Sequence, residues 1–116
     1  MLFRSRPGFA KKPENISNIR KSIFTMSHIR TWRSFLWKMI NQDDLKDNYG
    51  NFWSVAGDLS FMYPMIEMSG IEHYRFMDDI NYIYNESNPI NDHKVNLDKV
   101  QNIVNLIRNK KPYNRI

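Results

Sequence analysis

The sequence predicts an α+β fold of about three helices and two or three strands, because its apolar residues follow two different periodicities. They recur at helical spacing in residues 54–68 and 97–107, and they alternate with polar residues in residues 74–84. A chain of 116 residues suffices for one domain or part of one. Its hydrophobic content of 41% is ordinary for a protein with a core.

Residues 1–15 form a basic arm that we predict to be irregular. Pro7, Gly8 and Pro13 interrupt regular structure there, since proline lacks a backbone N–H and glycine favours turns. Residues 16–116 carry the periodic patterns and form the single predicted domain.

Residues 16–51 change character along their length. The isoleucines of residues 16–24 suit one face of a helix, whereas residues 28–36 mix β-branched and aromatic residues with polar ones, which favours a strand. Residues 37–40 are expected to begin a short helix. The polar residues 41–51 are expected to form a loop.

The helix predicted over residues 54–68 contains a proline. Ser54 or Asp58 could cap its N-terminus by accepting hydrogen bonds from free backbone N–H groups. Pro64 cannot donate a backbone hydrogen bond and clashes one turn back. We therefore expect either a kink at Pro64 or a helix that begins near Leu59.

The C-terminal third combines a strand, a loop and a helix. Residues 85–93 are polar and form the expected loop, and Asn96 is the expected cap of the helix that follows. The residues that define the strand share one parity: Tyr74, Phe76, Ile80, Tyr82 and Tyr84. The residues that define the helix recur at its period: Leu97, Val100, Ile103, Val104 and Ile107.

Composition excludes several classes of function. The chain has no cysteine, which rules out a disulfide scaffold, a thiolate metal site and a cysteine nucleophile, and which fits a reducing compartment. The formal net charge of +5 is carried mainly by the two ends, while residues 41–92 are acidic. No recognised nucleic-acid motif accompanies the basic ends, so nucleic-acid binding is not expected. No apolar run approaches the roughly 20 residues of a membrane span, and we predict a cytoplasmic protein.

Three stretches, taken in order, resemble one enzyme family. The first is Ser27-His28-Ile29-Arg30-Thr31-Trp32-Arg33, followed by Leu36-Trp37-Lys38-Met39-Ile40. The second is Ala56-Gly57-Asp58-Leu59-Ser60-Phe61-Met62-Tyr63-Pro64-Met65-Ile66-Glu67-Met68-Ser69-Gly70. The third is Tyr82-Ile83-Tyr84-Asn85, followed by Asn88-Pro89-Ile90-Asn91-Asp92-His93-Lys94. Together with the ending Lys111-Pro112-Tyr113, they resemble the acceptor-side half of family-2-type glycosyltransferases. The resemblance implies a partial GT-A-like domain that transfers a sugar from a nucleotide-sugar donor to a hydroxyl acceptor.

The donor-binding half of such an enzyme is not represented in this sequence. No two aspartates lie two positions apart, as an Asp-x-Asp metal motif requires, and no glycine-rich phosphate loop is present. A divalent cation, manganese or magnesium, is therefore expected only if a donor-binding half completes the site. The expected partners are such a donor-binding chain or a second copy of this chain, together with the sugar acceptor.

Asp58 is the candidate general base, because the resemblance places it where the family has its catalytic carboxylate; a plain helix cap is the alternative. On a loop, the neutral imidazole of His93 could complete a metal site begun by carboxylates elsewhere, and Lys94 could contact phosphate, although a solvated polar loop explains both. His28 and Arg30 would share one face of a strand and could line the acceptor cleft, or simply face solvent.

Trp53 could stack on a sugar ring, although tryptophan more often packs in a core or an interface. The competing function is a non-catalytic interaction module derived from a glycosyltransferase. Such a fragment would expose the apolar surface that a donor domain once covered, and it would tend to associate.

Overall fold

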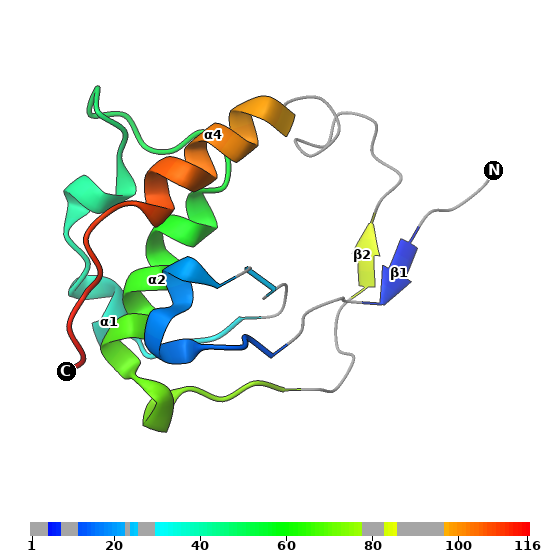
Figure 1. The fold of residues 1–116 in the computed structure, drawn as a ribbon, viewed down its shortest axis with the longest axis vertical. Helices are drawn as coiled ribbons and strands as arrows, with labels where there is room; N and C mark the ends of the chain where they lie inside the picture. The colour runs from blue at the N-terminus through cyan, green and yellow to red at the C-terminus, as the bar shows by residue number, and fades with distance from the viewer. Residues whose placement is uncertain (1–4, 8–11, 23, 26–29, 78–82, 86–96) are drawn as a thin grey trace.

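A computed structural model describes residues 5–7, 12–22, 24–25, 30–77, 83–85 and 97–116. Helix dominates these residues (Figure 1). In chain order the elements are β1 (Ser5–Pro7), the 3₁₀ helix η1 (Ile16–Lys21), α1 (Ser34–Lys38), the 3₁₀ helix η2 (Gln42–Leu45), α2 (Gly57–Ser69), the 3₁₀ helix η3 (Ile71–His73), β2 (Ile83–Asn85) and α4 (Leu97–Arg108).

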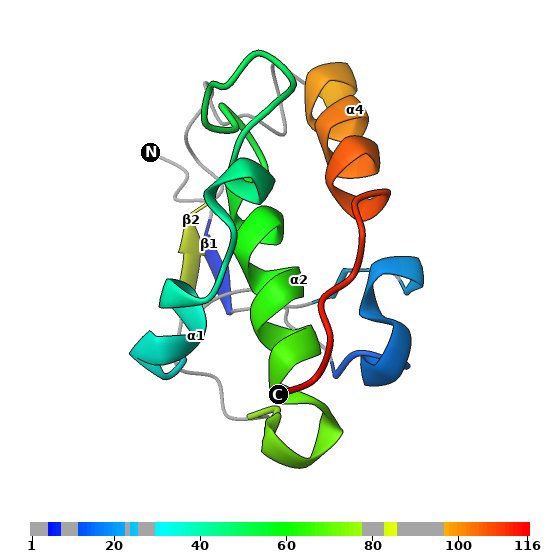
Figure 2. The same cartoon turned by 90° about the vertical axis from the view of Figure 1, so that its left-hand side faces the viewer.

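Helix α2 forms the centre of the molecule. Figures 1 and 2 show η1, α1, α4 and the C-terminal tail arranged around it. A helix that is apolar on all sides must be buried on all sides, and the sequence of α2 is of this kind. Its buried residues are Leu59, Ser60, Met62, Tyr63, Pro64, Met65, Ile66 and Met68.

The surrounding elements each contribute a few apolar side chains to the core. Ile16 and Ile19 come from η1, Leu36 comes from α1, and Val100 and Ile107 come from α4. The helix expected over residues 97–107 is present as α4, and its buried residues lie on the face that the periodicity indicated. Among the described residues, no helix is long and apolar enough to cross a membrane.

The start of α2 differs from the expectation. Ala56 occupies the N-cap position, and no side chain accepts a capping hydrogen bond there. Capping by Ser54 or Asp58 is therefore wrong. The helix begins at Gly57, two residues before Leu59, and it continues through Pro64, which lies inside it and is buried.

The predicted α+β fold is contradicted, as is the partial GT-A-like domain that the resemblance implied, because the described part of the chain is helical. Residues 30–33 precede α1 without forming a strand, and residues 74–77 are irregular. Arg33 and Tyr74 do have extended backbones, with φ and ψ of −78° and 134° and of −99° and 137°. However, residues 34–36 of the strand predicted over residues 28–36 belong to helix α1, and a sheet also needs a neighbouring strand about 4.8 Å away.

Strand pairing among the described residues is limited to β1 and β2. They run antiparallel, with Ser5 opposite Asn85, Arg6 opposite Tyr84 and Pro7 opposite Ile83. Figure 1 shows this short ribbon beside the helical body rather than within it. Part of the N-terminal arm is therefore paired with residues that come late in the chain.

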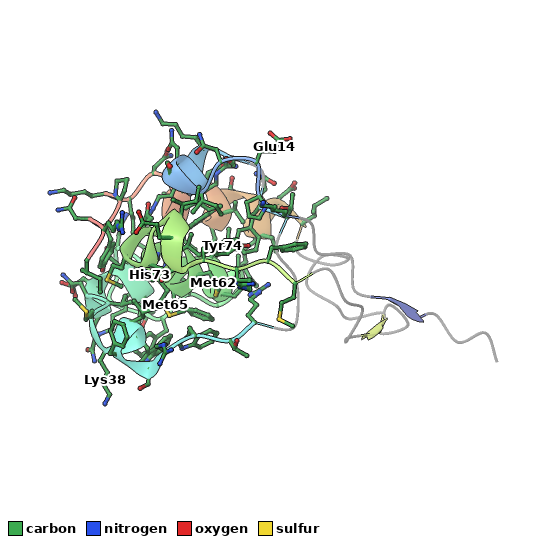
Figure 3. All side chains as sticks on the ribbon, turned by 90° about the horizontal axis from the view of Figure 1, so that it is seen from below. Glu14, Lys38, Met62, Met65, His73 and Tyr74 are labelled. Carbon is green, nitrogen blue, oxygen red and sulfur yellow. The ribbon has the colours of Figure 1, made fainter. Side chains whose placement is uncertain are left out.

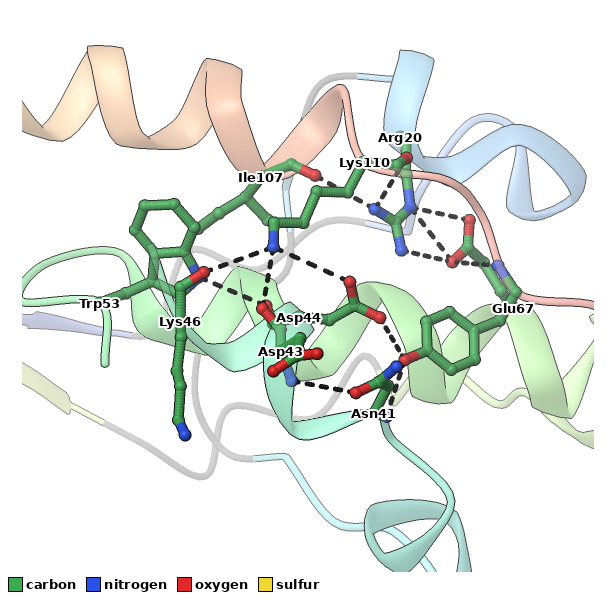
Figure 4. A network of polar contacts seen from close by, with 10 residues as sticks. Arg20, Asn41, Asp43, Asp44, Lys46, Trp53, Glu67, Ile107 and Lys110 are labelled. Atoms are coloured by element: carbon green, nitrogen blue, oxygen red, sulfur yellow. Dashed lines mark hydrogen bonds and ion pairs between the residues drawn. The ribbon is translucent and has the colours of Figure 1, made fainter. Parts of the chain in front are cut away.

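A buried ion pair joins η1, α2 and the end of α4 (Figure 4). Arg20 Nη2 lies 2.8 Å from Glu67 Oε1, and the two side chains are 6% and 10% exposed. Arg20 Nη1 also donates to the carbonyl oxygens of Ile107 and Lys110, at 3.1 Å and 3.2 Å. In return, Arg108 Nε donates to the Arg20 carbonyl at 2.7 Å. The two bonds that Arg20 donates satisfy carbonyls at the C-terminal end of α4 that have no partner within the helix.

Candidate functional site

The structure brings two of the sequence-predicted site residues, Arg30 and Asp58, into direct contact. Arg30 Nη1 lies 2.7 Å from Asp58 Oδ2, and the side chains are 13% and 36% exposed. Because the carboxylate remains partly exposed while the guanidinium is mostly covered, a solvent-borne molecule can reach the acid. Arg30 and Asp58 form the candidate site.

Asp58 is held in position by the first turn of α2. It lies two residues after Ala56, whose φ of 52° and ψ of 23° place it in the left-handed region. Ala56 is the sole residue other than glycine with positive φ among the described residues. That conformation costs about 1–2 kcal/mol for a residue with a Cβ, and such strain gathers at functional sites. The strained entry turn fixes the direction from which Asp58 leaves the backbone.

The guanidinium of Arg30 has an aromatic neighbour as well as an acidic one. Its central carbon lies 5.5 Å from the centroid of the Phe24 ring. Phe24 in turn packs edge-on against the buried Tyr63, with ring centroids 5.7 Å apart. Arg30 is therefore held between an aromatic ring and a carboxylate, and a planar guanidinium suits both contacts.

Trp53 lies close to the same helix start. A Cβ placed on Gly57 would be 3.8 Å from the Trp53 Cβ, so the tryptophan passes beside the residue that precedes Asp58. Its indole N–H donates to the Asp44 carbonyl at 3.3 Å, and the Lys110 ammonium lies 5.6 Å from the ring centroid. Trp53 is partly buried, and these contacts give it a packing role. Stacking on a sugar stays a prediction.

A polar network supports Trp53 from the side of the C-terminal tail (Figure 4). The Tyr113 hydroxyl donates to the Asp44 carboxylate and accepts a bond from the Asn41 N–H at 2.9 Å. Burial, together with the bond to Asp44, raises the pKa of Tyr113 to about 12. Lys110 lies 3.8 Å from the Asp44 carboxylate. The network ties the tail to the loop that leads into Trp53.

Sequence reasoning missed the structural role of Arg20 and Lys110. Both looked like solvated charges in basic ends of the chain. The available signal was the position of Arg20, directly after Ile16 and Ile19 on an apolar face, where a charge needs a buried partner. Glu67, which supplies that partner, binds Arg20 and not the Asp58 site.

His28, His93 and Lys94 lie outside the described residues, so their predicted roles stay predictions. The residues that the structure describes contain no group of three or more His, Asp or Glu side chains that could hold a metal ion. The divalent cation therefore remains an expectation attached to a donor-binding half. No protein-family model, curated protein or solved structure matches this chain.

Proposed function

We propose that this chain is the acceptor-side portion of a glycosyltransferase, with Asp58 as the general base, and that it is inactive without a donor-binding half. The observation that carries the proposal is the partly exposed Asp58 carboxylate, bound by Arg30 at 2.7 Å and not used as a helix cap. The proposal rests on these residues and on the ordered motifs, and it does not depend on a GT-A-like fold.

The proposed reaction assigns one proton transfer to this chain. Asp58 accepts the proton of the acceptor hydroxyl while the hydroxyl oxygen bonds to the anomeric carbon of the donor. The bond between that carbon and the nucleotide diphosphate breaks, and the diphosphate leaves with the bonding electrons. Arg30 acts as a positioning residue, because its bond to Oδ2 restricts rotation of the carboxylate.

A donor-binding half must supply everything that concerns the nucleotide. It would bind the diphosphate, offset the charge of the leaving group and bring the anomeric carbon to the acceptor. The non-catalytic interaction module remains the second candidate. It is favoured by four large apolar side chains that are exposed close to the site: Trp32, Phe35, Trp37 and Met39.

The test is Asp58→Asn, assayed for sugar transfer with a donor-binding half from a family-2-type glycosyltransferase added to the chain. Asparagine keeps the size of the side chain but cannot take the proton, so turnover should fall about 10²–10⁴-fold. The thermal midpoint should fall only modestly, since Asp58 makes no capping bond and the asparagine oxygen can still accept the hydrogen bond from Arg30.

Asp98→Asn is the matched control, because Asp98 also lies in the first turn of a helix but is exposed. Its turnover should equal that of the parent. If no acceptor sugar supports transfer with any donor half, or if Asp58→Asn turns over within about threefold of Asp98→Asn, the base assignment fails. The interaction module then becomes the better description.

A further inference from the structure

The segment from Trp32 to Met39 presents an unusual surface. Trp32, Phe35, Trp37 and Met39 are each between 42% and 49% exposed, whereas Leu36 within the same segment is buried in the core. Single exposed apolar residues are common on protein surfaces, but four within eight positions are unusual, and we call these four side chains the patch. Leu36 anchors the segment, so the patch is held outward by the fold.

The patch continues onto α2. Phe61 packs against Trp32 and Trp37, with ring centroids 5.6 Å and 5.3 Å apart. These ring contacts fix both indoles in orientation, so the exposed aromatic surface is preformed. Figure 2 shows α1 at one edge of the molecule.

Two exposed cations lie within the same segment as the patch. Residues 15–42 contain no acid, since Glu14 and Asp43 bound that run. Within the segment, Arg33 and Lys38 are exposed, and neither takes part in an ion pair with another described residue. Figure 3 shows Lys38 projecting from the edge of the molecule.

We propose that the Trp32–Met39 segment is a docking surface for an anionic lipid bilayer. Tryptophan and other large apolar side chains flanked by Lys and Arg suit the membrane interface, where the rings enter the headgroup region and the cations meet lipid phosphates or carboxylates. Charge complementarity selects an anionic surface, because the segment offers cations and no acid. The exposed Phe35 and Met39 side chains favour a bilayer over nucleic acid, which offers no apolar layer to receive them.

The docking is peripheral and weak, as expected of a short segment that lies on the surface without crossing it. It also brings the candidate site near the membrane, because Arg30 lies two residues before Trp32. The inference stands apart from the proposed glycosyl transfer, since its test uses neither sugar nor nucleotide. Either proposal can fail while the other holds.

The experiment measures binding of the full chain to vesicles of phosphatidylcholine alone and of phosphatidylcholine mixed with phosphatidylserine. The chain should sediment with the mixed vesicles, with a blue shift of its tryptophan emission. Binding should weaken strongly as salt rises from about 0.1 M to about 1 M, where the Debye length falls from about 10 Å to about 3 Å. Brominated lipids should quench the emission, which reports insertion of the indoles.

Two double variants of the patch, each with a matched control elsewhere on the molecule, locate the docking surface. Phe35→Ser with Met39→Ser should lower vesicle affinity at least about tenfold, because both side chains would leave the apolar layer. Ile71→Ser with Leu106→Ser removes similarly exposed apolar residues elsewhere and should leave affinity unchanged. Arg33→Glu with Lys38→Glu should also cost at least about tenfold, while the matched reversal Lys99→Glu with Lys111→Glu should cost much less.

Circular dichroism and thermal midpoints establish that each variant is folded before it is compared. Absence of binding to mixed vesicles by the folded parent overturns the proposal, as does equal loss in the patch variants and their controls. Sedimentation equilibrium supplies one more decisive result. If Phe35→Ser with Met39→Ser abolishes a dimer and leaves vesicle binding intact, the occupant of the patch is a second copy of the chain.

Discussion

At the scale of single residues, the most consequential interaction is the buried pair of Arg20 and Glu67. The guanidinium uses three of its nitrogens, two toward Glu67 and one toward carbonyls at the end of α4. A buried charge is costly unless it is paired and hydrogen bonded, and both conditions are met here. The pair therefore links three elements that are far apart in sequence.

Replacing Arg20 by methionine should destabilise the chain by about 3–5 kcal/mol, because the Glu67 carboxylate would stay buried without its cation. Urea unfolding followed by circular dichroism measures this change. Glu72→Gln serves as control, since its partner Arg115 is exposed and surface ion pairs contribute little. Similar unfolding midpoints for the two variants would contradict the structural role of Arg20.

The raised pKa of Tyr113 predicts how the free energy of unfolding changes at high pH. Its pKa is raised to about 12, first by burial and then by the hydrogen bond it donates to Asp44. The unfolded chain loses this proton near pH 10, so it binds fewer protons than the folded chain between about pH 10 and pH 12. The stabilisation that Tyr113 contributes to the folded chain is therefore complete below about pH 10, and it decreases as the pH rises toward 12.

The measurement is urea unfolding across pH 9–12 for the parent and for Tyr113→Phe. Phenylalanine cannot ionise, so the decline with pH should be shallower in the variant. Burial also raises the pKa of Tyr63 and Tyr74, and these residues provide a background common to both proteins. Parallel declines would show that the tail is not held by Tyr113 in the folded state.

At the scale of elements, the end of α2 shows how backbone conformation and packing combine. Gly70 closes the helix with φ of 70° and ψ of 172°, and its N–H donates to the Ile66 carbonyl at 3.0 Å. That region of backbone space is close to glycine-only. A Cβ at this position would also lie 2.8 Å from the Arg115 Cδ. The C-terminal tail therefore passes directly over the turn.

Gly70→Ala should lower the free energy of unfolding by about 1–3 kcal/mol, since it adds backbone strain and displaces Arg115. Gly50→Ala is the matched control: its φ is also positive, at 82°, but a Cβ there meets nothing within 4 Å. Its cost should be about 1 kcal/mol, from the backbone alone. Thermal unfolding compares the two, and equal losses would mean that the tail does not pack over Gly70.

At the scale of the whole molecule, the arrangement is a central buried helix with shorter elements around it. The last residues of the tail bind to the C-terminal half of α2. The Ile116 N–H donates to the Met68 carbonyl at 3.0 Å, and the Tyr113 N–H donates to the Glu67 carboxylate at 3.2 Å. The candidate site lies at the N-terminal end of α2, and the tail clamps the other end. Asp58 and Glu67, both in one helix, thereby serve separate regions.

The isolated chain should not bind nucleoside diphosphate sugars with micromolar affinity. Its sequence has no Asp-x-Asp motif and no glycine-rich phosphate loop, so no set of ligands is available for the diphosphate and its cation. Calorimetric titration with UDP- and GDP-sugars in the presence of manganese measures this directly. Micromolar binding by the chain alone would show that the donor site lies within these 116 residues.

The sequence by itself determined the two main helices: α4 by its apolar periodicity, which depends only on local spacing, and α2 by an apolar stretch long enough for a helix. It determined the absence of cysteine chemistry as well. It also singled out Asp58 and Arg30 separately. Only the tertiary structure decided that Arg30 and Asp58, 28 positions apart, form an ion pair, and that Arg20 is buried against Glu67. It likewise decided that the extended residues before α1 lie outside any sheet. Pairing across long separations depends on how the elements pack, and local periodicity carries no information about which distant partner a strand or a charge will meet.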